Sequence, residues 1–147
     1  MTADMQEPPR AAQVPFMWPV RVYYEDTDAA GVVYYANYLK FMERARTEWL
    51  RALGFEQTTL AREHHVVFVV RALNVEYRLP AKFNDELEVS VVFEGARGSV
   101  TELAQTVRRG TQTLVTAAVR LACVNPQGFK PVRIPHSIVV KLAAGHA

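Results

Sequence analysis

Two carboxylates stand two residues apart, at Asp26 and Asp28, shortly before a segment with the pattern of a helix. A carboxylate can act as a general base or as a nucleophile. Backbone N–H groups at the start of a helix can stabilise an oxyanion as it develops. Together these groups provide what the hydrolysis of an activated acyl group requires.

Other interpretations of the two carboxylates are open. Asp28 precedes Ala-Ala-Gly, and aspartate is common at such positions simply because it suits turns. In an extended segment Asp26 and Asp28 would lie on one face, about 6.6 Å apart along the strand. A metal or a shared proton is then conceivable, but no His or Cys lies nearby to complete a ligand set. We therefore predict a solvated turn charge at Asp26, and at Glu25, and no metal.

A helix must position this site, and the residues predict one from Asn37, the expected N-cap, to Leu53. Gly54 follows and can adopt the left-handed geometry that ends many helices. The apolar residues of one stripe, at spacings of three and four, are Met42, Ala45, Trp49 and Leu53. The charged residues fall mostly elsewhere on the helix: Lys40, Glu43, Arg44, Arg46, Glu48 and Arg51.

Alternating apolar residues predict a strand over Val14–Tyr24, with Pro15 and Pro19 making its first half an edge or an irregular lead-in. Further strands are predicted after the helix, at Val66–Leu79, Glu86–Glu94, Ser99–Arg108 and Thr111–Val124. Short, turn-rich connections favour antiparallel neighbours. Ser137–Ala144 fits either a short helix or a last strand.

The expected fold class is therefore α+β, with one helix covering one face of a curled antiparallel sheet. An exposed sheet edge invites pairing with another chain. We accordingly expect a homo-oligomer.

Length and composition fit one domain over residues 14–147 after a flexible tail over residues 1–13, since half of the 147 residues are hydrophobic. The 17 basic and 15 acidic residues are scattered, which argues against a nucleic-acid partner. No apolar run is long enough to span a membrane, and the N-terminus lacks the apolar segment of a secretory signal. The single cysteine, Cys123, excludes an intrachain disulfide and permits a reducing cytoplasm, where we expect the protein.

The run from Glu25 to Leu39, followed by Phe41-Met42-Glu43 and Trp49, resembles hotdog-fold acyl-CoA thioesterases of the 4-hydroxybenzoyl-CoA thioesterase family. It is most similar to the bacterial branch associated with the Tol-Pal envelope system. The stretch Ala81–Val89 is also similar, and the resemblance covers approximately residues 20–135. It implies a five- or six-stranded antiparallel sheet wrapped around a central helix, dimers or tetramers, and no metal or other cofactor.

The resemblance also implies roles for individual residues. Asp28 matches the catalytic carboxylate, and the backbone N–H of Tyr35 matches the group that polarises the thioester carbonyl. Relatives in the Tol-Pal branch carry His at the position of Tyr35, whereas 4-hydroxybenzoyl-CoA thioesterases of this type carry Tyr. The implied substrate is an acyl-CoA, with acyl carrier protein as the alternative carrier.

Apolar and aromatic side chains are the predicted walls of the acyl pocket and favour a short- to medium-chain or aromatic acyl group: Val32, Val33, Tyr34 and Phe68. Arg97 falls where the family places basic side chains on the phosphates of CoA. Arg71, Lys82 and Arg133 are alternatives for that contact.

The remaining reactive side chains have simpler interpretations. His64 and His65 would point to opposite faces of a strand, so they cannot bind one ion. Glu43 is expected on the helix surface or in a polar network, and Cys123 in the core.

Two other functions compete with hydrolysis: a module that binds acyl-CoA or acyl carrier protein without turnover, and an enoyl hydratase on the same fold. The absence of His between Val14 and Arg62 disfavours the hydratase, which typically uses a His next to the helix.

Overall fold

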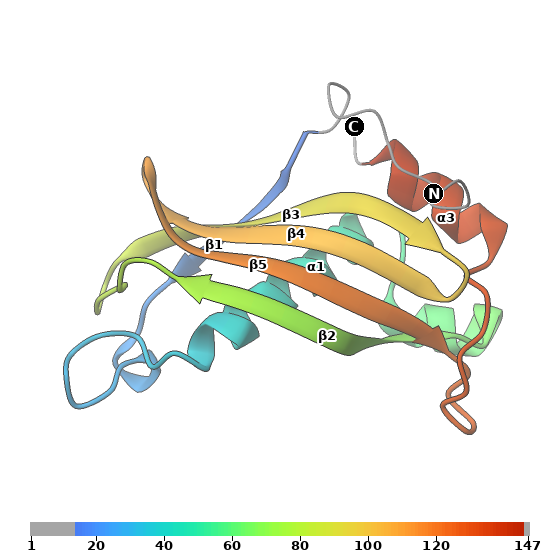
Figure 1. Cartoon of the computed structure of the whole chain (residues 1–147), viewed down its shortest axis with the longest axis horizontal. Helices are drawn as coiled ribbons and strands as arrows, with labels where there is room; N and C mark the ends of the chain where they lie inside the picture. Colours follow the sequence, from blue (N-terminus) through green and yellow to red (C-terminus); the bar gives the residue numbers. More distant parts are fainter. Residues whose placement is uncertain (1–13, 146–147) are drawn as a thin grey trace.

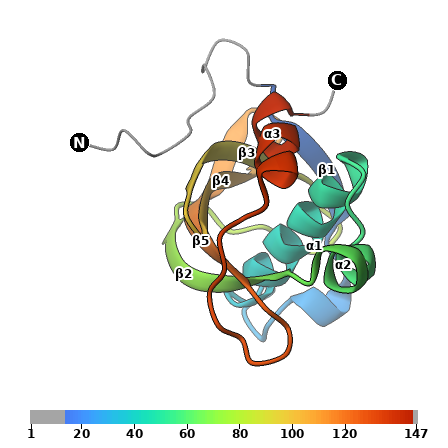
Figure 2. The ribbon, with the colours of Figure 1, turned by 90° about the vertical axis from the view of Figure 1, so that its right-hand side faces the viewer.

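A computed structural model describes residues 14–145, in which a five-stranded sheet curls around one long helix, α1 (Figure 1). The strand order is β1-β3-β4-β5-β2, and all neighbours are antiparallel. Viewed from the end, the helix lies inside the curl of the sheet (Figure 2). The α+β prediction is confirmed. The tail predicted over residues 1–13 lies outside the described residues.

The strands follow the predicted segments closely. Their bounds are Phe16–Arg21 for β1, Val67–Tyr77 for β2, Glu86–Arg97 for β3, Val100–Arg109 for β4 and Gln112–Val124 for β5. Strands β3, β4 and β5 are joined by short turns, as the Gly-containing connections predicted.

The prediction that the first strand continues to Tyr24 is wrong. β1 ends at Arg21, and Tyr24–Asp26 form a turn of 3₁₀ helix. The carboxylate of Asp26 accepts a hydrogen bond of 2.8 Å from the backbone N–H of Tyr23 and so stabilises the turn. Asp26 and Asp28 therefore do not share one face of an extended strand.

Helix α1 runs from Asn37 to Ala52, and the predicted stripe from Met42 to Leu53 is buried. Gly54 follows with φ of +94°, the positive value that favours glycine after a helix. The predicted cap is wrong by one residue, because Ala36 is the N-cap. The amide of Asn37 instead donates 2.9 Å to the carbonyl oxygen of Asp26 and ties the helix start to the preceding loop.

After α1 come a short helix, α2 (Gln57–Thr59), and a π-helical turn at Leu60–His64, so the histidine pair does not lie on a strand as predicted. The C-terminal segment forms a helix, α3, at His136–Ala144, which decides between the two predicted structures. In the described part of the chain, no helix combines the length and apolar character needed to cross a membrane.

The core lies between α1 and the concave face of the sheet, mainly against β3 and β1. Its largest enclosed side chains include Phe41, Phe93 and Met42. The edge strand β2 is different, because α1 leaves much of it uncovered. Val70 and Leu73 are 45% and 39% exposed.

One residue of α1 departs from the prediction. Arg46, which the charge pattern placed away from the apolar stripe, is buried, with 8% of its surface exposed. Its guanidinium donates 3.0 Å to the side-chain oxygen of Gln105 on β4. Gln105 in turn donates to the carbonyl oxygens of Met42 and Ser90. The helix is thus tied to the sheet by a buried polar network.

Candidate active site

The loop before α1 folds back on itself as a tight hairpin. Thr27 pairs with Val33, and the backbone N–H of Asp28 donates 2.9 Å to the carbonyl oxygen of Val32. Gly31 turns the chain with φ of +82°, which a residue with a side chain rarely adopts. The hairpin brings Asp28 beside the residues that lead into the helix.

The Asp28 side chain is exposed, and its Oδ1 accepts 2.9 Å from the backbone N–H of Ala30. This bond orients the carboxylate, and no side-chain cation of the described residues pairs with it. The Tyr34 phenol lies close by. Its pKa is raised, first by a hydrogen bond with Tyr35, then by repulsion from Tyr35 and by burial, with the Asp28 charge adding to the shift.

Asp26 has a structural place in this loop. Its carboxylate caps the 3₁₀ turn, and its carbonyl oxygen accepts from Tyr34 N at 2.9 Å and from the Asn37 amide. Among the described residues, no group of three or more His, Cys, Asp or Glu side chains could hold a metal ion.

Three hydrogen bonds fasten the loop to the body of the molecule. Val33 N donates 2.9 Å to the carbonyl oxygen of Ala81, and Ala81 N donates 2.9 Å to the buried Tyr38 hydroxyl. The Tyr77 hydroxyl, at the end of β2, donates 3.1 Å to the carbonyl oxygen of Tyr35. The position of Tyr35 therefore depends on two other elements, α1 and β2.

The backbone N–H of Tyr35 takes part in none of the hydrogen bonds found within residues 14–145. It lies just before the first turn of α1, where the helix dipole is positive. An unused donor at this place is suited to a carbonyl oxygen that gains negative charge.

A mostly apolar pocket of about 240 Å³ opens beside this donor. It is lined by Val33, Tyr35, Tyr38, Tyr77, Arg78, Leu79 and Pro80. Tyr35 and Tyr77 meet edge to face, with ring centroids 6.1 Å apart. The pocket can thus surround an apolar or aromatic acyl group whose carbonyl lies at the Tyr35 N–H.

Comparison with known proteins identifies the family. A family model described as the thioesterase-like superfamily matches residues 22–142. The chain belongs to this superfamily. The acyl-CoA thioesterase YbgC of Haemophilus influenzae is 47% identical over 123 residues, which are 84% of this chain and 90% of the relative.

A second sequence relative and a crystal structure point to the same family. The acyl-CoA thioester hydrolase YbgC of Escherichia coli O157:H7 is 48% identical over 127 residues, 86% of this chain and 94% of that protein. The crystal structure of a probable thioesterase from Bartonella henselae superposes with a TM-score of 0.79 at 37% identity, covering 83% of this chain and all of that one. The predicted hotdog fold and the predicted class of enzyme, a thioester hydrolase, are confirmed.

Within the superfamily fold, the predicted site residues separate into two groups. Asp28, Tyr35, Val33 and Tyr34 share the loop before α1, where Val33 is buried and the other three are exposed. Phe68 lies near the other end of β2, about 30 Å along the strand from Tyr77. The fold of one chain does not bring Phe68 to Asp28.

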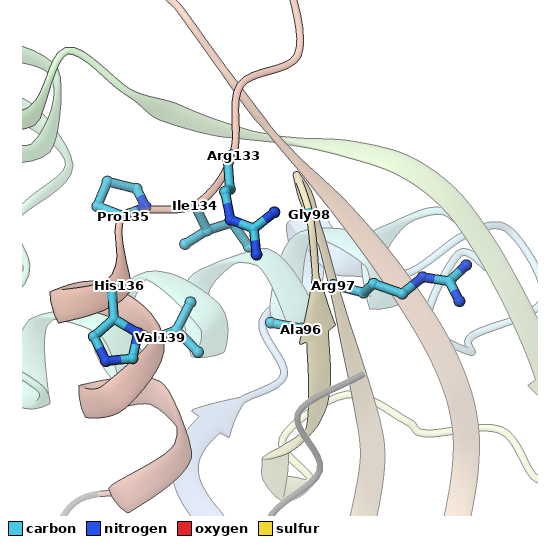
Figure 3. Close-up of a pocket in the computed structure, with 8 residues that line it drawn as sticks. All are labelled: Ala96, Arg97, Gly98, Arg133, Ile134, Pro135, His136 and Val139. Atoms are coloured by element: carbon cyan, nitrogen blue, oxygen red, sulfur yellow. The ribbon is translucent and has the colours of Figure 1, made fainter. Parts of the chain in front are cut away.

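Arg97 is also remote from Asp28. It ends β3, which begins at Glu86 on the side of the active-site loop, so the two ends are about 36 Å apart along the strand. Arg97 borders a pocket of about 250 Å³ with Arg133 and His136, at the start of α3 (Figure 3). In Figure 3 the head group of Arg97 points away from His136.

Cys123 is fully buried, and burial raises the pKa of its thiol to about 11. The buried position confirms the predicted place of Cys123 in the core, and the thiol is protonated at neutral pH. Glu43 is exposed on α1, in agreement with a helix-surface position.

Sequence reasoning missed two groups that hold the site in place. Tyr77 ends a strand-like pattern, and nothing local to it indicates a bond to Tyr35. Asp85 pairs with Arg109 at 2.6 Å, beside the segment that anchors Val33. Burial alone would raise the pKa of Asp85, but hydrogen bonds from Lys82 N and from Arg109 lower it below its ordinary value.

Proposed function

We propose that this chain hydrolyses acyl-CoA thioesters to the free acid and CoA, with Asp28 as the reacting carboxylate and the Tyr35 N–H as the oxyanion donor. One observation supports this most strongly. An exposed carboxylate and an unused backbone donor share the loop that leads into α1, beside an apolar pocket. The names of the YbgC relatives support the same substrate class.

In the proposed reaction the carbonyl oxygen accepts a hydrogen bond from Tyr35 N. Asp28 either attacks the carbonyl carbon or removes a proton from an attacking water. The carbon–sulfur bond then breaks, and CoA leaves as its thiolate. If Asp28 has attacked, water must then cleave the resulting anhydride, which releases the acid and restores the carboxylate. Such an N–H donor contributes about 10²- to 10³-fold to the rate of acyl transfer.

Single-turnover hydrolysis in ¹⁸O-labelled water separates the two roles of Asp28. Label in the enzyme carboxylate supports an anhydride intermediate. Label that enters the product acid alone excludes opening of an anhydride at the carboxyl carbon of Asp28.

The pocket beside Tyr35 fits the predicted short- to medium-chain or aromatic acyl groups. Aromatic rings from Tyr35, Tyr38 and Tyr77 line it, and its volume of about 240 Å³ suits a small acyl group. We keep acyl carrier protein as the alternative carrier of the acyl group, and the cytoplasm as the predicted location.

The β2 edge supports the predicted homo-oligomer, a dimer or a tetramer. This strand has 11 residues, and no strand of residues 14–145 pairs with its outer side. Exposed edges of this length pair readily with a second chain. In such an assembly Arg97 would bind the CoA phosphates of a substrate whose thioester lies at a partner's loop, since Arg97 is remote from Asp28 of its own chain.

This assignment of Arg97 has a direct test. Arg97→Gln should raise KM for an acyl-CoA but leave KM unchanged for the same acyl group on N-acetylcysteamine, which lacks the nucleotide. An equal change for both substrates would exclude a phosphate contact.

The proposed activity is tested by thiol release from short-, medium- and long-chain and aromatic acyl-CoAs. Asp28→Asn should lower turnover at least a hundredfold, because it removes the charge with almost no change of shape. Asp26→Asn is the matched control, since Asn keeps the turn-capping oxygen, and we expect a rate within a few-fold of the parent.

Two results would replace the proposal. Tight binding of acyl-CoA by a folded protein with no thiol release would indicate the non-catalytic binding module. Hydration of crotonyl-CoA without thiol release would indicate the enoyl hydratase.

A further inference from the structure

The buried guanidinium of Arg46 is the one charged group among the buried residues of the described chain. Burying a cation is costly unless an anion or several hydrogen bonds compensate it. Burial lowers the pKa of Arg46, and the charge of Glu43 only partly opposes that shift. A buried guanidinium of this kind is stabilised by an anion or by further hydrogen-bond acceptors.

Within the described residues, the guanidinium of Arg46 has no anion and too few hydrogen-bond acceptors. No carboxylate oxygen lies within 4.0 Å of the guanidinium, and its one hydrogen bond goes to the neutral amide of Gln105. A guanidinium has five N–H donors. The only enclosed side-chain atom of the described residues without a partner is the hydroxyl oxygen of Thr101. The nitrogens of Arg46 that make no bond are therefore not sealed inside the protein.

Arg46 lines a second pocket, of about 270 Å³, between α1 and β2. Its lining residues are Leu39, Lys40, Met42, Glu43, Arg46, Val70 and Leu73. Most of the exposed lining is apolar. A mostly apolar pocket with a buried cation in its wall, and with the exposed Lys40 and Glu43 at its rim, fits an apolar group that ends in an anion.

This pocket and the pocket beside Tyr35 both lie along the seam between α1 and β2. Tyr38 and Tyr77 line the first pocket, and one step further along the same helix and strand, Met42 and Leu73 line the second. Arg46 is about 16 Å from Tyr35 along the helix, and helical side chains lean toward the helix start. An acyl group whose thioester carbonyl is hydrogen-bonded to the Tyr35 N–H can thus extend between α1 and β2 toward the guanidinium.

On the basis of the proposed function, we propose that Arg46 is a specificity residue that binds a carboxylate at the far end of the acyl group, so that the preferred substrates are thioesters of dicarboxylic acids. The charged end would accept up to two further hydrogen bonds from the guanidinium, and the methylene groups would lie between Met42 and Leu73. A simple fatty acyl group of equal length would leave the cation without a partner.

The test compares acyl-CoAs that differ only in the terminal group: adipoyl with hexanoyl, and suberoyl with octanoyl. Binding is measured by calorimetry on the Asp28→Asn protein, and kcat/KM on the parent. A hydrogen-bonded ion pair of this kind should favour the diacid by about tenfold or more. Equal or weaker binding of both diacids would overturn the proposal and would indicate that water or a carboxylate of a second copy serves Arg46.

Variants then assign the preference to this residue. Arg46→Met should abolish the preference for the diacid, and Arg46→Lys should keep part of it. Arg44→Met is the matched control, because Arg44 is exposed on the same helix, over the Phe41 ring, and does not line the seam. An equal loss for both acyl groups in Arg46→Met would reveal a structural role and overturn the proposal.

The two proposals fail separately. If no acyl-CoA releases thiol, the proposed activity is wrong, while the calorimetric ratio still decides the role of Arg46. If Arg46→Met does not fold, the ratio in the parent and in Arg46→Lys still gives the answer.

Discussion

The loop that carries Asp28 and the network around Gln105 differ in how completely their polar groups are hydrogen-bonded. In the loop the Asp28 carboxylate and the Tyr35 N–H are accessible and not fully used. In the network Gln105 is 1% exposed and uses both ends of its amide. A polar group left unpaired in water costs little, whereas the same group left unpaired in the core costs about 1–3 kcal/mol. The loop therefore keeps its polar groups available for chemistry, whereas the amide of Gln105 is used up in holding the helix to the sheet.

The largest effect that this comparison predicts is on the rate. Asp28→Asn should lower thiol release at least a hundredfold but change the free energy of unfolding by no more than about 0.5 kcal/mol, the usual range for surface positions. Urea denaturation of both proteins checks the second half. A loss of stability as large as that of a core variant would show that the Asp28 carboxylate stabilises the fold and is not a surface group free for chemistry.

The network should show the reverse. Gln105→Leu removes the acceptor of the Arg46 guanidinium and should lower the free energy of unfolding by about 3 kcal/mol, since a buried charged donor loses its bond. We expect the rate per folded molecule to fall less than tenfold. Unchanged stability would contradict the structural role of this residue.

Tyr77 combines a structural role with a place at the candidate active site. Its ring lines the pocket, and its hydroxyl holds the backbone of Tyr35. Tyr77→Phe removes one hydrogen bond and should cost about 1 kcal/mol. Because that bond positions the Tyr35 N–H, kcat should fall several-fold while KM changes little. A change confined to KM would indicate contact with the acyl group instead.

Thr101 provides a test of opposite sign. Its buried hydroxyl oxygen has no hydrogen-bond partner, and the residue is 1% exposed. Thr101→Val replaces the hydroxyl by a methyl group of similar shape and should raise the free energy of unfolding by up to about 1 kcal/mol. Thermal denaturation checks the sign. A loss of stability would show that the hydroxyl does have a partner in solution.

The smallest effect concerns Cys123. With a folded pKa of about 11, the thiol keeps its proton in the native state at pH values where the unfolded chain, with a pKa of about 8.5, has lost it. The unfolded state then binds fewer protons, so stability falls as pH rises. Between pH 8 and pH 9 this group should contribute a loss of about 0.7 kcal/mol. The Cys123→Ala protein should lack this part of the pH dependence, whatever its absolute stability.

The local pattern of the chain was enough to predict most of the framework. The stripe from Met42 to Leu53 predicted the buried face of α1, because helical periodicity places these residues on one side. The strands β2 to β5 followed from their β-branched residues and the turns between them. The start of the site was less predictable. The bond from Tyr23 N to Asp26 formed a 3₁₀ turn where alternation alone indicated a strand.

What the sequence determined by itself was the set of elements and the loop that carries Asp28 and Tyr35, since periodicity and turn chemistry act between residues close in the chain. The tertiary structure decided which distant residues meet. Packing placed Arg46 against Gln105, 59 positions away, and Tyr77 against Tyr35, 42 positions away. The register of the long strands also carried Phe68 and Arg97 away from Asp28. Such contacts depend on how the sheet curls around the helix, which no short segment specifies.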